Sequence, residues 1–226
     1  MKTKYTLYLF FILLTAISCD EINESPAEVN MEMEFDGAVD NNLQFSNLNL
    51  IIEEVTVKAD QENGEKFSFT EDLNKENLIL STGVTENLFK FNLPPAIYNN
   101  ITIEISLREN EDANSIVFSG SLLSRSPMQN DIPILFEQQG GDLISLNIKP
   151  TSGNKNEIVV KRGEKIDALI SIDASYIFQR INTGLLIAAE KSSVKGVNSV
   201  LINRQKNPEI YNTLSPRVNQ SFRARF

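Results

Sequence analysis

The segment EVNMEMEFDG, residues 28–37, alternates strictly between apolar and polar side chains. Val29, Met31, Met33 and Phe35 occupy one parity, and asparagine, glutamate or aspartate occupies the other. A period of two residues over this length predicts a β-strand with one face in a core and the other in water. This segment sets the fold class, because the same pattern recurs along the chain.

Several further segments alternate in the same way. They are LNLIIEEVTVKA (48–59), NLFKFNL (87–93), ITIEISL (101–107) and KIDALISID (165–173). In the first of them the apolar parity changes at Glu53 and Glu54, which predicts a β-bulge. Asn63-Gly64 is a hairpin signal. About eight or nine short strands with turns between them predict a mainly β chain, folded as an antiparallel β-sandwich over residues 28–178.

The last part of the chain has a helical period instead. Asn207-Pro208 suits a helix start. Apolar side chains then recur every fourth residue, at Ile210, Leu214, Val218, Phe222 and Phe226. We expect residues 207–226 to form an amphipathic helix packed on the sandwich, kinked or broken near Pro216 because proline removes a backbone hydrogen bond. Residues 179–206 carry weak signals and are expected to be irregular.

The first 18 residues have the order of an export signal. Lys2 and Lys4 precede an uncharged apolar run, Tyr5 to Leu14, and small residues follow. The run is shorter than the roughly 20 residues that a membrane-spanning helix needs. We therefore predict a signal peptide over residues 1–18, directly before Cys19, the only cysteine of the chain.

Ala16, Ile17, Ser18 and Cys19 resemble the lipobox of bacterial lipoproteins, although that family prefers leucine where this chain has Ala16. The resemblance implies that Cys19 carries diacylglycerol, becomes the new N-terminus and attaches the protein to a membrane. The alternative is a free cysteine beside a plain cleaved signal.

Residues 19–27 are expected to be an acidic tether, with Asp20, Glu21 and Glu24 close to the anchor. This acidity resembles the surface-export signal of some Gram-negative outer-membrane lipoproteins. It implies attachment to the outer membrane with the domain facing outward. The alternative is a solvated tether with no targeting role.

LPPAIYNNITIEISL, residues 93–107, is similar to a recurrent element of uncharacterised lipoproteins with a prealbumin-like (transthyretin-like or immunoglobulin-like) sandwich. In these proteins a strand ends in Leu-Pro, a turn carries a tyrosine and an alternating strand follows. Ala96 stands where their turn usually has glycine. The resemblance covers residues 28–178 and implies a fold, since the family has no established activity.

Composition excludes several kinds of chemistry. The chain has no histidine, so Ser-His-Asp and Cys-His catalysis are excluded, as are the usual zinc and copper sites. Carboxylate-based hydrolysis and hard-cation binding remain open. The excess of acidic residues over residues 19–112 argues against nucleic-acid binding, which requires a basic surface. The basic residues near the end are expected to form a solvated helix face; they are Arg204, Lys206, Arg217, Arg223 and Arg225.

Three places are candidate sites. Asn110, Asp112 and Asn114 alternate in a polar turn and are weak calcium candidates, although the glycine of a calcium loop is absent. Glu53 and Glu54 at the bulge make a poor catalytic pair, because adjacent strand residues point to opposite faces. Tyr98 could stack on a sugar or pack against the end of the sandwich.

No nucleophile, base or metal constellation stands out, so no cofactor is expected. The sequence favours a non-enzymatic, lipid-anchored envelope protein that is displayed on the surface and acts in adhesion, assembly or ligand capture. Its partner would be a protein or a carbohydrate that the sequence does not identify. Two alternatives remain: a periplasm-facing structural accessory of an envelope complex, and a carboxylate-based hydrolase.

Overall fold

The computed structural model describes residues 25–40, 42–108, 114–124, 130–140, 143–148 and 157–226. These residues form thirteen β-strands in two sheets, together with the helices α2 (Ala174–Phe178), α3 (Thr183–Ala188) and α4 (Pro208–Val218). The prediction of a mainly β chain with a helix near the C-terminus is confirmed. The strand number exceeds the predicted eight or nine because several short strands have too few residues to show a clear alternation.

The smaller sheet has the order β13-β10-β1-β4. Its strands are β13 (Phe222–Arg225), β10 (Lys165–Asp173), β1 (Ala27–Asp36) and β4 (Thr85–Leu93). β1 is central, and its side chains Val29, Met31, Met33 and Phe35 are buried as the alternation predicts. β1 runs antiparallel to β4 but parallel to β10, so the sheet is not purely antiparallel as expected.

The larger sheet has the order β11-β12-β7-β6-β2-β5-β8, with β3 paired to β2 and β9 paired to β5. Its strands are β11 (Lys191–Val194), β12 (Val197–Ile202), β7 (Ile132–Gln139), β6 (Asn114–Leu122), β2 (Leu43–Gln61), β5 (Ala96–Leu107), β8 (Leu143–Asn147), β3 (Lys66–Ser81) and β9 (Ile158–Val160). β12 and β7 form a second parallel pair. Hairpins dictate antiparallel pairing, but strands that are distant in sequence can pair in either direction.

The long strand β2 changes partners along its length. Residues before Ile51 pair with β6, and residues from Ile52 onward pair with β5. The register shifts between Ile52 and Glu54, so the predicted bulge is confirmed. The bulge restores the apolar side chains of the second half of β2, such as Val55, to the core after the change of partner.

An aromatic cluster joins the two sheets to the helices. The Phe118 ring of β6 lies 5.8 Å from the Phe35 ring of β1 and 5.8 Å from the Phe178 ring of α2. The Phe136 ring of β7 stacks on the Tyr211 ring of α4 at 5.8 Å. The sheets therefore pack face to face, and the same buried core anchors α2 and α4.

Residues 179–206 are not irregular as predicted, because α3, β11 and β12 lie there. Lys195 and Gly196 have φ angles of 50° and 82°, which suit a two-residue hairpin turn between β11 and β12. The segment gave a weak signal because three of the four β11 residues are polar and only part of β12 is buried. The larger sheet thus extends beyond residue 178.

The C-terminal helix is shorter than predicted. Ile210, Leu214 and Val218 are buried on α4 as expected, and the helix runs unbroken through Pro216. A 3-10 turn (Asn219–Ser221) then ends it, and Phe222 begins β13. Apolar residues continue at helical spacing to Phe226. Phe222–Arg225 nevertheless form a strand, because the free edge of β10 offers backbone hydrogen bonds to them.

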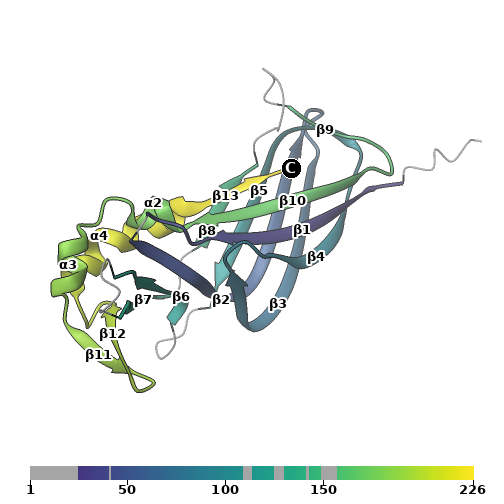
Figure 1. The fold of residues 1–226 in the computed structure, drawn as a ribbon. Coiled ribbons are helices and arrows are strands. Elements are labelled where there is room, and N and C mark those ends of the chain that lie inside the picture. The colour runs from purple at the N-terminus through teal and green to yellow at the C-terminus, as the bar shows by residue number, and fades with distance from the viewer. Residues whose placement is uncertain (1–24, 41, 109–113, 125–129, 141–142, 149–156) are drawn as a thin grey trace, which may run out of the picture.

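The molecule has two distinct ends (Figure 1). β1 enters at the right-hand end, where the Ser25 carbonyl accepts a 3.0 Å hydrogen bond from the Gly163 amide in the turn before β10. The helices α2, α3 and α4 gather at the left-hand end, which we call the helical end. The helical end is therefore far from the point at which the described chain begins.

Candidate functional site

The residues singled out in the sequence are scattered. Cys19, Asn110 and Asp112 lie outside the described residues. Asn114 begins β6 and pairs with Gln139 of β7. Glu53 and Glu54 are exposed at the bulge in β2. Among the described residues, no hydrogen bond or ion pair joins Asn114, Glu53 and Glu54 into one site.

Tyr98 has a structural position. Its side chain is fully buried, so the ring presents no face for a sugar. Its hydroxyl donates a 2.6 Å hydrogen bond to the backbone carbonyl of Pro94. Burial raises the pKa of Tyr98 to about 12, and a hydrogen bond with Gln61 acts in the opposite direction.

The basic residues do not share a helix face, which corrects the sequence prediction. Lys206 pairs with Glu190 at 2.6 Å, whereas Arg217 donates to the Ile177 carbonyl at 3.2 Å. Arg223 lies over the Tyr176 ring. These side chains come from a loop, from α4 and from β13, because the predicted long helix is divided between three elements.

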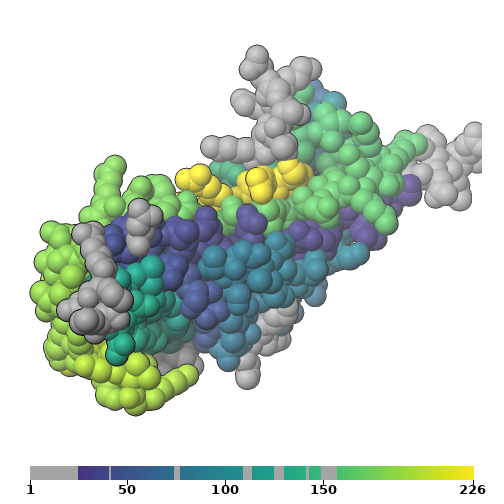
Figure 2. Space-filling model, in the orientation of Figure 1, coloured from purple at the N-terminus to yellow at the C-terminus, as the bar shows by residue number. Residues whose placement is uncertain are grey.

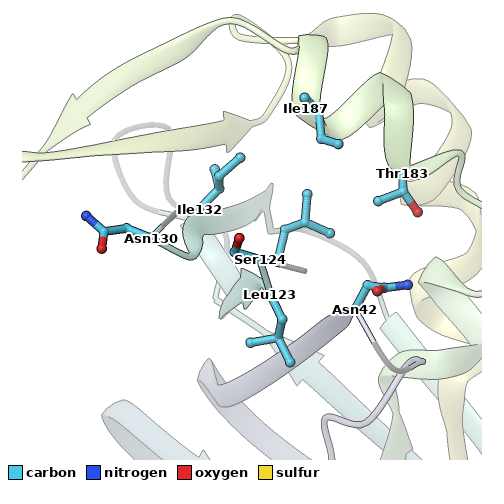
Figure 3. Close-up of a pocket in the computed structure, with 8 residues that line it drawn as sticks. Asn42, Leu123, Ser124, Asn130, Ile132, Thr183 and Ile187 are labelled. Atoms are coloured by element: carbon cyan, nitrogen blue, oxygen red, sulfur yellow. The ribbon is translucent and has the colours of Figure 1, made fainter. Parts of the chain in front are cut away.

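A pocket of about 410 Å³ opens at the helical end (Figure 3). One wall is α3, from which Thr183 and Ile187 project toward the ends of the strands. The opposite wall consists of Asn42 before β2, the segment Leu122–Ser124 at the end of β6, and Asn130 and Ile132 at the start of β7. Its volume falls in the roughly 300–1,000 Å³ range of small-molecule sites.

Local hydrogen bonds hold the pocket walls. The Leu123 amide donates to the Asn42 carbonyl at 2.6 Å, and the Ser124 amide donates to Asp131 Oδ1 at 2.8 Å. Asn182 caps α3 by accepting a 2.8 Å hydrogen bond from the Gly184 amide. One of these bonds joins two backbone groups and two reach side-chain oxygens, and together they fix the segments that form the pocket walls.

The described residues that line the pocket suit the binding of a ligand but include no charged group for catalysis. Four lining side chains are apolar and four are neutral and polar; they are Leu122, Leu123, Ile132 and Ile187, and Asn42, Ser124, Asn130 and Thr183. None of these side chains carries a charge at neutral pH, so the described lining supplies no acid-base pair. Its mixture of apolar walls and a few polar groups is typical of a recognition site.

Exposed apolar side chains occur on α3 and on the β11–β12 hairpin of the helical end. Leu186 faces the core from α3, so its neighbours Leu185 and Ile187 lie on the flanks of the helix and are 55% and 57% exposed. Val197 in the β11–β12 hairpin is 52% exposed. These three residues, which we call the apolar rim, belong to the segment that forms the surface of the helical end in Figure 2. Sequence reasoning missed the pocket and the rim, although Asn182 before an apolar run was an available helix-start signal.

Comparisons with known proteins found no match to this chain among family models, curated proteins or solved structures. In the described part of the chain, no helix has the length and apolar character needed to cross a membrane.

Proposed function

We propose that this chain is a non-enzymatic, lipid-anchored protein of the bacterial cell envelope. It is attached to the outer membrane through Cys19, faces outward, and acts in adhesion, assembly or ligand capture through its helical end. The observation that carries this proposal is the placement of the pocket and the apolar rim at the end opposite the start of β1. An anchor before β1 would hold that end away from the membrane.

The lining of the pocket supports recognition over catalysis. Apolar walls with a few neutral polar groups suit a protein segment or a small molecule, and apolar side chains on a rim are common at interaction surfaces. A periplasm-facing accessory would use the same surface against an envelope partner. A carboxylate-based hydrolase would need two converging acidic side chains, about 5 to 9.5 Å apart.

We propose further that the fold is a sandwich of the prealbumin-like or immunoglobulin-like kind. A sandwich of the prealbumin-like or immunoglobulin-like kind is supported by Tyr98, whose hydroxyl bonds to a backbone carbonyl four residues upstream, at the connection between strands of different sheets. Immunoglobulin-like sandwiches use a tyrosine corner of this kind. The parallel pairs β1–β10 and β12–β7 are additions to an otherwise antiparallel arrangement.

Fractionation of cells that express the wild-type chain or Cys19→Ala tests the anchor. The wild-type protein should sediment with membranes, dissolve in detergent and carry a lipid mass on Cys19, whereas Cys19→Ala should be released in soluble form. A wild-type protein of unmodified mass in the soluble fraction would contradict the proposal.

A further inference from the structure

A second, smaller cavity lies beside α2 and the end of α4. Its volume is about 190 Å³, and its lining residues are Tyr176, Gln179, Arg180, Arg217 and Gln220. We call it the arginine pocket. It is smaller than the roughly 300 Å³ at which pockets for drug-sized molecules begin, so it fits a small ion or one functional group of a larger molecule.

The arginine pocket has an excess of positive charge. Arg180 and Arg217 line it, and the Arg223 guanidinium lies 6.0 Å from the centre of the Tyr176 ring. Among the described residues, no carboxylate lies within 4.0 Å of these three guanidinium groups. In a chain of net charge −9, three arginines without an acidic partner form a local site that attracts anions.

Hydrogen bonds hold these groups in place without using all their donors. Arg217 donates one N–H to the Ile177 carbonyl and keeps the others of its five. The Tyr176 hydroxyl donates to Gln220 Oε1 at 3.0 Å, which leaves the NH₂ group of that amide as a donor. The negative ends of α2 and α4 oppose anion binding, but α2 has only five residues and Arg217 occupies its Ile177 carbonyl.

A polar groove continues from the arginine pocket. It has a volume of about 950 Å³, shares Gln220 with the pocket, and runs between β13 and β8. Its polar lining includes Arg223, Arg225, Asn147 and Ser145. Amide and hydroxyl side chains hydrogen-bond readily to hydroxyl groups, whereas guanidinium groups pair with phosphate or carboxylate in a two-point geometry.

We propose that the arginine pocket binds the phosphate or carboxylate group of an acidic sugar, and that the adjoining groove receives the sugar hydroxyl groups. This site is separate from the pocket at the helical end and does not depend on the lipid anchor. A phospholipid headgroup could present the same phosphate. The polar lining of the groove favours the sugar, because amide and hydroxyl side chains there can bind the sugar hydroxyl groups beside the anionic group.

Calorimetric titration of the purified full chain in neutral detergent tests this proposal. The probes are glucose 6-phosphate, glucuronate, inorganic phosphate and glucose. At least one acidic sugar should bind saturably and more tightly than inorganic phosphate, and glucose should not bind. Arg180→Gln removes an exposed guanidinium from the pocket and should weaken this binding by about ten- to hundredfold, the range for a lost hydrogen bond to a charged group. Arg223→Gln should also weaken it.

Arg162→Gln is the matched control, because it removes the same charge from an exposed turn before β10, at the opposite end of the molecule. It should leave the affinity unchanged. If Arg180→Gln and Arg162→Gln weaken the binding of the acidic sugar equally, the effect comes from overall charge and the proposal is overturned. The absence of saturable binding of either acidic sugar would also overturn it. Binding to phosphatidylglycerol vesicles but to neither sugar would overturn the assignment of a sugar ligand.

Discussion

The hydroxyl of Tyr98 donates a 2.6 Å hydrogen bond to the backbone carbonyl of Pro94, across the corner at which the chain leaves one sheet for the other. Pro94 follows β4 in the smaller sheet, and Tyr98 lies in β5 of the larger sheet. The ring is fully buried, so this bond fixes the connection between the sheets from inside the core. The bond should therefore contribute to the stability of the fold.

Tyr98→Phe should lower the free energy of unfolding by about 1–3 kcal/mol. The ring packing is retained, but the carbonyl of the partly buried Pro94 loses its partner, and a lost partner costs roughly that amount. Denaturant unfolding of both proteins measures the difference. Tyr176→Phe is a control for removing a phenol, because Tyr176 bonds to the exposed Gln220 and its loss should cost less.

The same residue predicts how stability depends on alkaline pH. Burial raises the pKa of Tyr98 to about 12 from its ordinary value of 10. Below pH 10 the phenol is protonated in both the folded and the unfolded chain, and its contribution is fully present. Between about pH 10 and 12 only the unfolded chain ionises, so stability should fall as the pH rises. In Tyr98→Phe this fall should be shallower, and equal slopes in both proteins would contradict the prediction.

Asn207 should be the most sensitive residue at the start of α4. Its side-chain NH₂ donates to the Leu201 and Glu190 carbonyls at 2.7 and 3.0 Å, and its Oδ1 accepts from the Glu190 amide at 3.0 Å. Its φ angle of 53° lies in the left-handed region. Asn207→Ala removes the bonds and adds backbone strain, which should cost about 2–4 kcal/mol.

Asn207→Gly separates these two effects. It removes the same hydrogen bonds but tolerates the left-handed backbone, so it should be less destabilising than Asn207→Ala by about 1 kcal/mol. Thermal unfolding followed by circular dichroism measures both. If the alanine and glycine variants are equally stable, the backbone conformation of Asn207 contributes nothing.

The apolar rim should serve contact with a partner and contribute little to stability. Leu185→Ser combined with Ile187→Ser should change the free energy of unfolding by less than about 1 kcal/mol, because both side chains are more than half exposed. A photo-crosslinking residue at Thr183, in the pocket wall, should form adducts in intact cells, and the double variant should abolish them. The same residue at Glu62, in the turn after β2, should form none. Equal adducts at Thr183 and Glu62 would contradict a recognition role for the helical end.

Local patterns in the sequence predicted the strands where burial alternates. The segment that begins at Glu28 became β1, which starts one residue earlier at the buried Ala27. The turn at Asn63-Gly64 connects β2 and β3, and Pro94-Pro95 separates β4 from β5. In each case the interactions that form the element join residues close together in the sequence, so a local pattern is enough to predict it.

Long-range pairing was not predictable in this way. Nothing near Val29 indicates that β1 pairs in parallel with Ile166 of β10. The spacing of Phe222 fits a helix, yet this residue pairs with Ile172 as a strand because a neighbouring edge is open. The two pockets also depend on contacts between segments that are distant in the sequence, such as Asn42 with Leu123. A local sequence pattern cannot predict such contacts.

Protease treatment of intact cells tests the central claim of outward display most directly. Wild-type protein and Cys19→Ala would be compared, with a periplasmic protein as the control for membrane integrity. We predict that the wild-type protein is degraded without lysis, while the periplasmic control is spared and Cys19→Ala is absent from the cell surface. Protection of the wild-type protein until the outer membrane is opened would contradict outward display and favour a periplasm-facing accessory.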